Sequence, residues 1–115
     1  MVYYQGDIVL INFPFTDLSN SKARPAAIVS KKSYNDENED VLVVGITSQA
    51  RTGQFICHVT NNDCPKLCKA PKLESWVVCD KVFTLKQSII IKSIDRLKRN
   101  KLNDVLGKVK LVFED

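Results

Sequence analysis

The stretch Gly6–Ser30, with the sequence GDIVLINFPFTDLSNSKARPAAIVS, sets the start of the fold. Its two apolar runs are rich in β-branched residues and predict strands over Ile8–Asn12 and Ala26–Ser30. The polar residues between these runs predict a long loop, and a long loop in a compact domain often carries function. Arg24 stands where this loop enters the second strand, so we expect the fold to hold its position.

Four segments farther along the chain have the apolar character or the alternation of strands: Val41–Ser48, Gln54–Val59, Glu74–Asp80 and Ser88–Lys92. Between them, Asn35–Asp40 and Asn61–Lys72 predict loops, and Leu85–Gln87 predicts a single turn. Apolar residues recur at helical spacing after Asn100, which suits an N-cap. The sequence therefore predicts a mainly β fold with a C-terminal helix. We expect a small SH3-like barrel or a strongly bent antiparallel sheet, as one domain over residues 1–115.

The composition is that of an ordinary globular protein, with 44% hydrophobic and 26% charged residues among 115. Residues 1–7 lack the basic start and apolar core of a signal peptide. No apolar run approaches the roughly 20 residues that a bilayer crossing requires. We therefore expect a cytoplasmic protein that does not contact the membrane.

The net charge is +4, from 17 Lys and Arg against 13 Asp and Glu. The basic residues gather in three segments, Lys31–Lys32, Lys66–Lys72 and Lys92–Lys101. If these segments share a face, a nucleic acid could bind there, although a solvated surface is the commoner explanation for any one of them.

The four cysteines, Cys57, Cys64, Cys68 and Cys79, raise the question of disulfides or metal binding. Without a secretion signal, a disulfide framework is not expected. Cys57 and His58 followed by Cys64 and Cys68 offer zinc-binding side chains, but their spacing fits no common closed zinc site. We expect free or partly buried thiols, no metal and no cofactor.

The second informative stretch is Gly45–Gln49, where an apolar strand ends in two hydroxyl residues, Thr47 and Ser48. Gly45 would allow a close approach of the backbone. Taken alone, this segment is explained by hydroxyls that bond their own backbone at the end of a strand.

Several segments in order resemble the MazF/PemK toxin family, whose members are small ribonucleases that cut single-stranded RNA. The resemblance covers nearly the whole chain and includes Gly6–Val9, Arg24–Ala26, Ile46–Ser48, Ser75–Val77, Asp80–Val82 with Thr84–Leu85, and the leucine-rich C-terminal helix. It implies an SH3-like barrel that forms a homodimer. It also implies RNA cleavage without a metal, and neutralisation by a cognate antitoxin protein.

The resemblance also implies a set of site residues, and their chemistry suits RNA cleavage by the 2′-OH. Arg24 is a permanently cationic, multidentate donor for the phosphorane oxygens. Thr47 would hydrogen-bond the scissile phosphate with help from Ser48, and Asp80 matches the aspartate of the family's fifth-strand motif. The expected RNA-binding residues are Ser19, Lys22, Gln49, Arg51 and Lys81. The structural alternative for Arg24 is a salt bridge with Asp7 or Asp17.

The sequence departs from the family pattern at three positions, Ala23, Val78 and Phe83, where many members have basic residues. The general acid and base are therefore not identified. His58, the only histidine, has a suitable pKa range, but a surface histidine beside a cysteine is the simpler interpretation. Two alternatives remain open: a catalytically degenerate RNA- or protein-binding module on the same fold, and a toxin of the gyrase-poison type.

Overall fold

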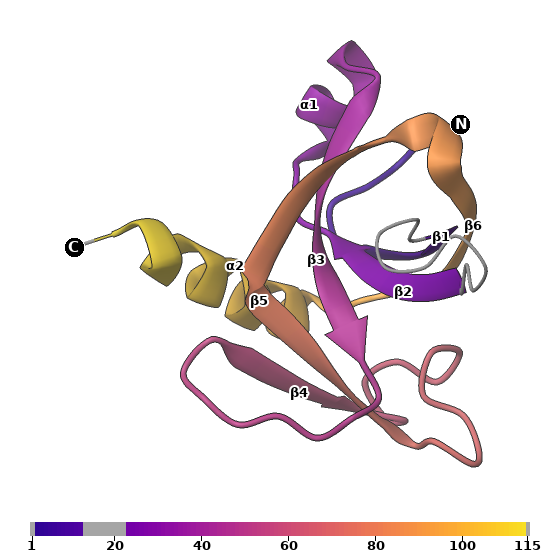
Figure 1. Cartoon of the computed structure of the whole chain (residues 1–115), viewed down its shortest axis with the longest axis vertical. Helices are drawn as coiled ribbons and strands as arrows, with labels where there is room; N and C mark the ends of the chain where they lie inside the picture. The colour runs from indigo at the N-terminus through magenta and orange to yellow at the C-terminus, as the bar shows by residue number, and fades with distance from the viewer. Residues whose placement is uncertain (1, 13–22, 115) are drawn as a thin grey trace.

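The computed structural model describes residues 2–12 and 23–114. Six strands lie in this part of the chain: β1 (Asp7–Asn12), β2 (Ala23–Ile28), β3 (Asp40–Thr47), β4 (Ile56–Thr60), β5 (Glu74–Lys86) and β6 (Ile90–Arg96). They form one antiparallel sheet in the order β4-β5-β3-β2-β1-β6. The sheet is strongly bent and open, with β4 and β6 at its edges (Figure 1). The predicted mainly β fold with a C-terminal helix is confirmed.

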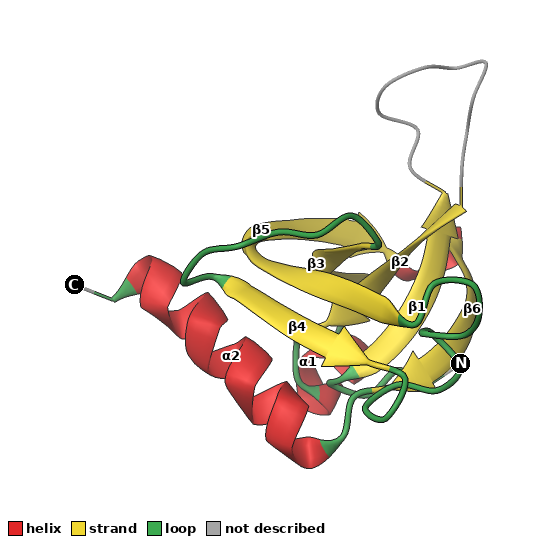
Figure 2. Cartoon of the chain, turned by 90° about the horizontal axis from the view of Figure 1, so that it is seen from below, coloured by secondary structure: helices red, strands yellow, loops and turns green. Residues whose placement is uncertain are grey.

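The helical elements are α1 (Lys32–Glu37), the 3₁₀ turn η1 (Gln87–Ile89) and α2 (Arg99–Phe113). α2 runs along β4 and β5 and covers one face of the sheet (Figure 2). No helix within residues 2–12 and 23–114 combines the length and hydropathy needed to cross a bilayer.

The bend of the sheet comes from an irregularity in the pairing of β3 with β5. Val44 pairs with Val82, whereas the next residue, Gly45, pairs with Val78. The intervening residues 79–81 therefore bulge from the ladder, which increases the local twist. The prediction that this strand ends at Asp80 is wrong, because the charged residues there occupy the bulge and the strand continues to Lys86.

Two apolar clusters lie on the two faces of the bent sheet. The cluster beneath α2 contains Ile8, Val44, Val77, Leu102 and Val105, together with all four cysteines. The second cluster contains Tyr3, which precedes β1, and otherwise strand residues that alternate with those of the first cluster: Val9, Ile11, Ala26, Ile28, Val41, Val43, Leu85 and Ile90. The near-continuous apolar character of β3 is explained by this arrangement, because both of its faces are buried.

The loop predicted over Asn35–Asp40 is partly wrong, because α1 includes residues 32–37. The helix is held by a tertiary contact that the local sequence does not reveal. The buried Asn35 side chain donates through Nδ2 to the carbonyls of Tyr3 and Ser30, both at 3.1 Å.

α2 begins at Arg99, and its N-cap is Lys98, two residues before the N-cap expected at Asn100. Other boundaries shift by a few residues, and the turn predicted at residues 85–87 is η1, two residues later. The last turn of α2 exposes three apolar side chains, and Phe113 is 74% exposed.

Gly107 lies on the exposed side of α2, and a Cβ added there would meet nothing within 4 Å. We expect Gly107→Ala to raise the free energy of unfolding by about 1 kcal/mol, because glycine is a poor helix former. Urea denaturation would measure the change. A fall in stability would mean that the helix backbone is not regular at this position.

Candidate functional site

The register between β2 and β3 brings Arg24 and Thr47 together. Ala26 pairs with Gly45, and because the strands are antiparallel, Arg24 and Thr47 lie two residues outward on the same face. Both residues line the same two adjoining pockets. In the sequence, 22 residues lie between Arg24 and Thr47, so the strand pairing and not their closeness along the chain brings them together.

The larger pocket, here called the cationic pocket, has a volume of about 610 Å³. Its walls come from the start of β2, the end of β3 with the loop that follows, the loop before β5, and Ser75. The cationic side chains are Arg24, Arg51, Lys69 and Lys72, and the polar ones include Thr47, Ser48 and Gln49. Among its described lining residues there is no Asp or Glu. The pocket is therefore suited to an anion.

The cationic side chains of this pocket are not used in ion pairs with the described carboxylates. Asp7, which was one expected partner of Arg24, instead binds Arg96, whose Nε lies 2.7 Å from Asp7 Oδ1. Asp7 also accepts a bond from the backbone N–H of Tyr4. The salt bridge between Arg24 and Asp7 is thus excluded, and Asp17 lies outside the described residues.

The two hydroxyls at the end of β3 have defined partners. Thr47 Oγ1 accepts a hydrogen bond from the backbone N–H of Gln49 at 3.1 Å, which orients the hydroxyl. Lys72 Nζ donates to Ser48 Oγ at 3.2 Å across the pocket. The backbone-bonding role expected for such hydroxyls is therefore present at Thr47. Each oxygen retains a lone pair and each hydroxyl a proton that a bound phosphate could use.

Lys69 and Lys72 were not among the predicted site residues, although the basic segment Lys66–Lys72 gave a signal. Their loop is fixed by residues far away in sequence. Asp95 on β6 accepts the backbone N–H groups of Lys66 and Leu67 through Oδ2, at 2.8 and 3.0 Å. These bonds set the path of the loop toward the pocket.

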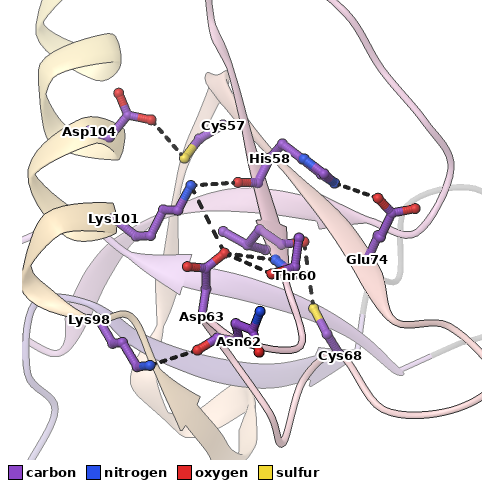
Figure 3. A network of polar contacts seen from close by, with 11 residues as sticks. Cys57, His58, Thr60, Asn62, Asp63, Cys68, Glu74, Lys98, Lys101 and Asp104 are labelled. Carbon is purple, nitrogen blue, oxygen red and sulfur yellow. Dashed lines mark hydrogen bonds and ion pairs between the residues drawn. The ribbon is translucent and has the colours of Figure 1, made fainter.

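The same loop is also bound to α2, as Figure 3 shows. Lys98 Nζ donates to the carbonyl of Asn62 at 2.6 Å, and Lys101 Nζ lies between the carbonyl of His58 and the Asp63 carboxylate. Asp63 in turn accepts the backbone N–H of Thr60. Lys101 of α2 and Lys98 at its N-cap therefore connect the helix to β4 and the loop that follows it.

The smaller pocket, here called the Gly45 pocket, has a volume of about 300 Å³ and adjoins the cationic pocket. Its lining residues are Arg24, Pro25, Gly45, Ile46, Thr47, Val78, Lys81 and Phe83. Lys81 thus lines the same pocket as Arg24, and its role in RNA binding stays a prediction. The close approach expected at Gly45 does not occur within the described chain, because a Cβ there would meet open space.

Two further candidates, Asp80 and His58, line neither of these pockets. Asp80 is exposed on the bulge of β5 and lines neither of them. Ser19 and Lys22 lie outside the described residues. His58 is exposed, bonds Glu74 Oε1 through Nε2 at 2.9 Å and stacks on Trp76, so it is also apart from Arg24 and Thr47.

All four cysteines are free and buried. Burial, and then a hydrogen bond from Cys57 Sγ to Asp104 Oδ2 at 3.0 Å, raise the pKa of Cys57 to about 12. Burial likewise raises the pKa of Cys64 to about 12 and that of Cys79 to about 11. In the described part of the chain, no three His, Cys, Asp or Glu side chains gather closely enough to hold a metal. These thiols act as core residues.

We expect the native thiols to resist alkylation at pH 8. With a pKa near 12, the thiolate fraction of Cys57 or Cys64 is roughly 10³-fold below that of a free cysteine, and burial slows the reaction further. Because folding raises these pKa values, the folded state favours the neutral thiols. Their contribution to the free energy of unfolding is fully present below about pH 8.5 and is lost as the pH rises toward 12. Iodoacetamide labelling followed by mass spectrometry would test this. Rapid labelling of any one cysteine in the folded protein would contradict it.

Residues 4–113 match the sequence profile described as "PemK-like, MazF-like toxin of type II toxin-antitoxin system". The profile defines the class as the toxin component of type II systems. The match extends over nearly the whole sequence, so the chain belongs to the PemK-like, MazF-like toxin family. No curated protein sequence matches the chain.

Solved structures with the same fold include MazF from Deinococcus radiodurans, at a TM-score of 0.75 and 21% identity, covering 98% of this chain and 97% of that one. A MazE–MazF complex from the same organism gives a TM-score of 0.78 at 22% identity, with 98% and 97% coverage. An endoribonuclease from Mycobacterial species gives 0.76 at 19% identity, with 98% and 92% coverage. At these identities the likeness shows the fold.

Proposed function

We propose that this protein is an endoribonuclease that cleaves single-stranded RNA without a metal ion. The observation that supports this most is the cationic pocket, where Arg24 and Thr47 lie together among three further cations and no described carboxylate. A polyanion with regularly spaced phosphates fits such a surface better than a single small anion would. Membership of the PemK-like, MazF-like family supports the same assignment.

The chemistry we propose uses the RNA's own 2′-OH as the nucleophile. Its oxygen attacks the adjacent phosphorus, the bond from phosphorus to the 5′ oxygen breaks, and the products are a 2′,3′-cyclic phosphate and a free 5′-OH. One proton moves overall from the 2′-OH to the leaving 5′ oxygen. Because DNA lacks the 2′-OH, this mechanism is selective for RNA.

Arg24 would stabilise the added negative charge of the phosphorane, since a guanidinium donates two bonds in the geometry that phosphate oxygens accept. Thr47 and Ser48 would hydrogen-bond the scissile phosphate, and the bond from Lys72 to Ser48 places a second cation beside it. Arg51, Lys69 and Lys81 would bind flanking phosphates, and Gln49 would contact a base edge. Asp80 has no role in this scheme because it lines neither pocket.

We further propose that the protein acts in the cytoplasm as a single-domain toxin over residues 1–115, and that a cognate antitoxin neutralises it. Two of the structural neighbours are a MazE–MazF complex and an endoribonuclease in complex with its cognate antitoxin. A homodimer is the proposed state. The exposed apolar side chains of Leu111, Val112 and Phe113 at the end of α2 are available for contacts with a second protein chain.

A second candidate is a module that binds RNA without cutting it. One observation favours this alternative: neither pocket is lined by a described histidine or carboxylate that could serve as a general base. The two candidates share the binding surface and differ only in the chemical step.

Incubation with a long single-stranded RNA in excess EDTA separates them. The nuclease proposal predicts discrete RNA fragments and intact DNA of the same sequence. RNA that is bound but intact after long incubation would favour the binding module, and RNA that is neither bound nor cut would contradict both.

A further inference from the structure

Gly45 pairs beside the bulge of β5, but its φ does not require a glycine. It lies inside β3, and the described glycines with positive φ are Gly6 and Gly53. A Cβ at Gly45 would meet nothing within 4 Å. Glycine weakens the interior of a strand, so a β-branched residue would suit the fold better. The position is explained if the space above it is needed for something else.

That space is the Gly45 pocket, and its walls are largely apolar. Val78 is the pairing partner of Gly45 on β5, and Pro25 and the half-buried Phe83 complete the apolar lining. Arg24 and Lys81 stand among the lining residues as cations, and no described Asp or Glu lines the pocket. A flat apolar ligand that is attached to an anion fits this combination.

The class of ligand follows from the fact that the two pockets adjoin each other. Both are lined by Arg24, Pro25, Ile46 and Thr47, so a group bound in one lies next to a group bound in the other. The cationic pocket offers hydroxyls and cations for a phosphate, whereas the Gly45 pocket offers apolar side chains. Within a single-stranded RNA, every phosphate is joined through a sugar to an unstacked base that can turn toward such a surface.

We propose that the Gly45 pocket binds one unpaired nucleobase of the RNA, adjacent to the phosphate held at Arg24 and Thr47. This inference rests on the proposed function only in taking RNA as the ligand of the cationic pocket. The absence of a side chain at Gly45 leaves room for the base, and Val78 and Phe83 contact its faces or edge. Gly45 is therefore a specificity-determining position, which selects bases by size and apolar contact.

The test uses a set of short 2′-O-methyl RNA oligonucleotides, each with one abasic position, so that binding is measured without cleavage. For the wild type, we expect one position at which loss of the base weakens binding by about 5-fold or more, as base stacking on protein side chains typically contributes. Gly45→Val should bind the complete oligonucleotide correspondingly more weakly. It should also have lost its sensitivity to the base at that position.

Gly107→Ala is the matched control, because its added Cβ also meets open space but lies on α2, away from both pockets. It should keep the wild-type binding pattern, and thermal unfolding should show that Gly45→Val is folded. If Gly45→Val binds the complete and the abasic oligonucleotides with the affinities of the wild type, the inference is overturned. The Gly45 pocket would then be assigned to an apolar side chain of a protein partner.

The result is separable from the nuclease proposal. Base-dependent binding that Gly45→Val abolishes would support the inference even if the wild type cleaves no RNA. If the wild type cleaves RNA and Gly45→Val binds the abasic oligonucleotides with unchanged affinities, the inference is overturned and the nuclease proposal is retained.

Discussion

Arg24→Ala is expected to lower the rate of RNA cleavage by roughly 10²- to 10³-fold, the usual cost of removing one donor that stabilises a transition-state anion. The stability of the fold should change little, because Arg24 is exposed and has no ion pair with a described carboxylate. Binding of an uncleavable RNA should weaken far less than the rate, since Arg51, Lys69 and Lys72 remain in the pocket. Single-turnover cleavage and urea denaturation would measure the two effects.

Two control variants make this result specific. Arg24→Lys keeps the charge but loses the two-pronged geometry, so it should recover only part of the activity. Arg99→Ala removes an exposed arginine at the start of α2, which lines neither pocket, and should cleave at the wild-type rate. An Arg24→Ala protein that cleaves within a few-fold of the wild type would show that Arg24 is not in the active site.

Gly6→Ala is expected to destabilise the fold by about 2–4 kcal/mol, which is a large part of the stability of a small domain. Gly6 has a φ of 94°, a conformation that side chains disfavour. An added Cβ would also lie 3.1 Å from Leu102 Cδ2 on α2. The backbone cannot relax freely, because the N–H of Gly6 donates to Ile28 O at 2.8 Å and its carbonyl accepts from Leu97 N at 2.9 Å.

The comparison with Gly107→Ala isolates the cause, since the same substitution is expected to stabilise the chain at a position with open space and a helical backbone. Denaturant midpoints of the two variants should therefore move in opposite directions. A Gly6→Ala protein with wild-type stability would mean that the strain and the contact with Leu102 are both relieved by small movements.

Much of the fold could be predicted because the strands have a clear apolar pattern. The alternation and β-branched content of the chain indicated six strands and a C-terminal helix. One element was missed and one strand was predicted too short, both for physical reasons. α1 depends on Asn35, whose bonds reach Tyr3, and β5 continues through the charged residues 80 and 81 because a bulge exposes them. Neither feature is encoded in a local pattern.

The candidate site was predictable only in part. Strands pairing in antiparallel register explain why Arg24 and Thr47 meet, and the family resemblance indicated both residues. Lys69 and Lys72 enter the site through a loop whose path depends on Asp95, more than twenty residues away, so their position was not visible in the sequence. The apolar Gly45 pocket likewise requires the three-dimensional arrangement of β2, β3 and β5.

The central claim is tested most directly by the chemical nature of the ends that this protein leaves on a single-stranded RNA in EDTA. We predict fragments with a 2′,3′-cyclic phosphate on one side of the cut and a free 5′-OH on the other. Polynucleotide kinase would label the 5′-OH without prior phosphatase treatment, and mass spectrometry would identify the cyclic phosphate. Fragments with 5′-phosphate ends, or cleavage that requires added magnesium, would contradict attack by the 2′-OH at Arg24.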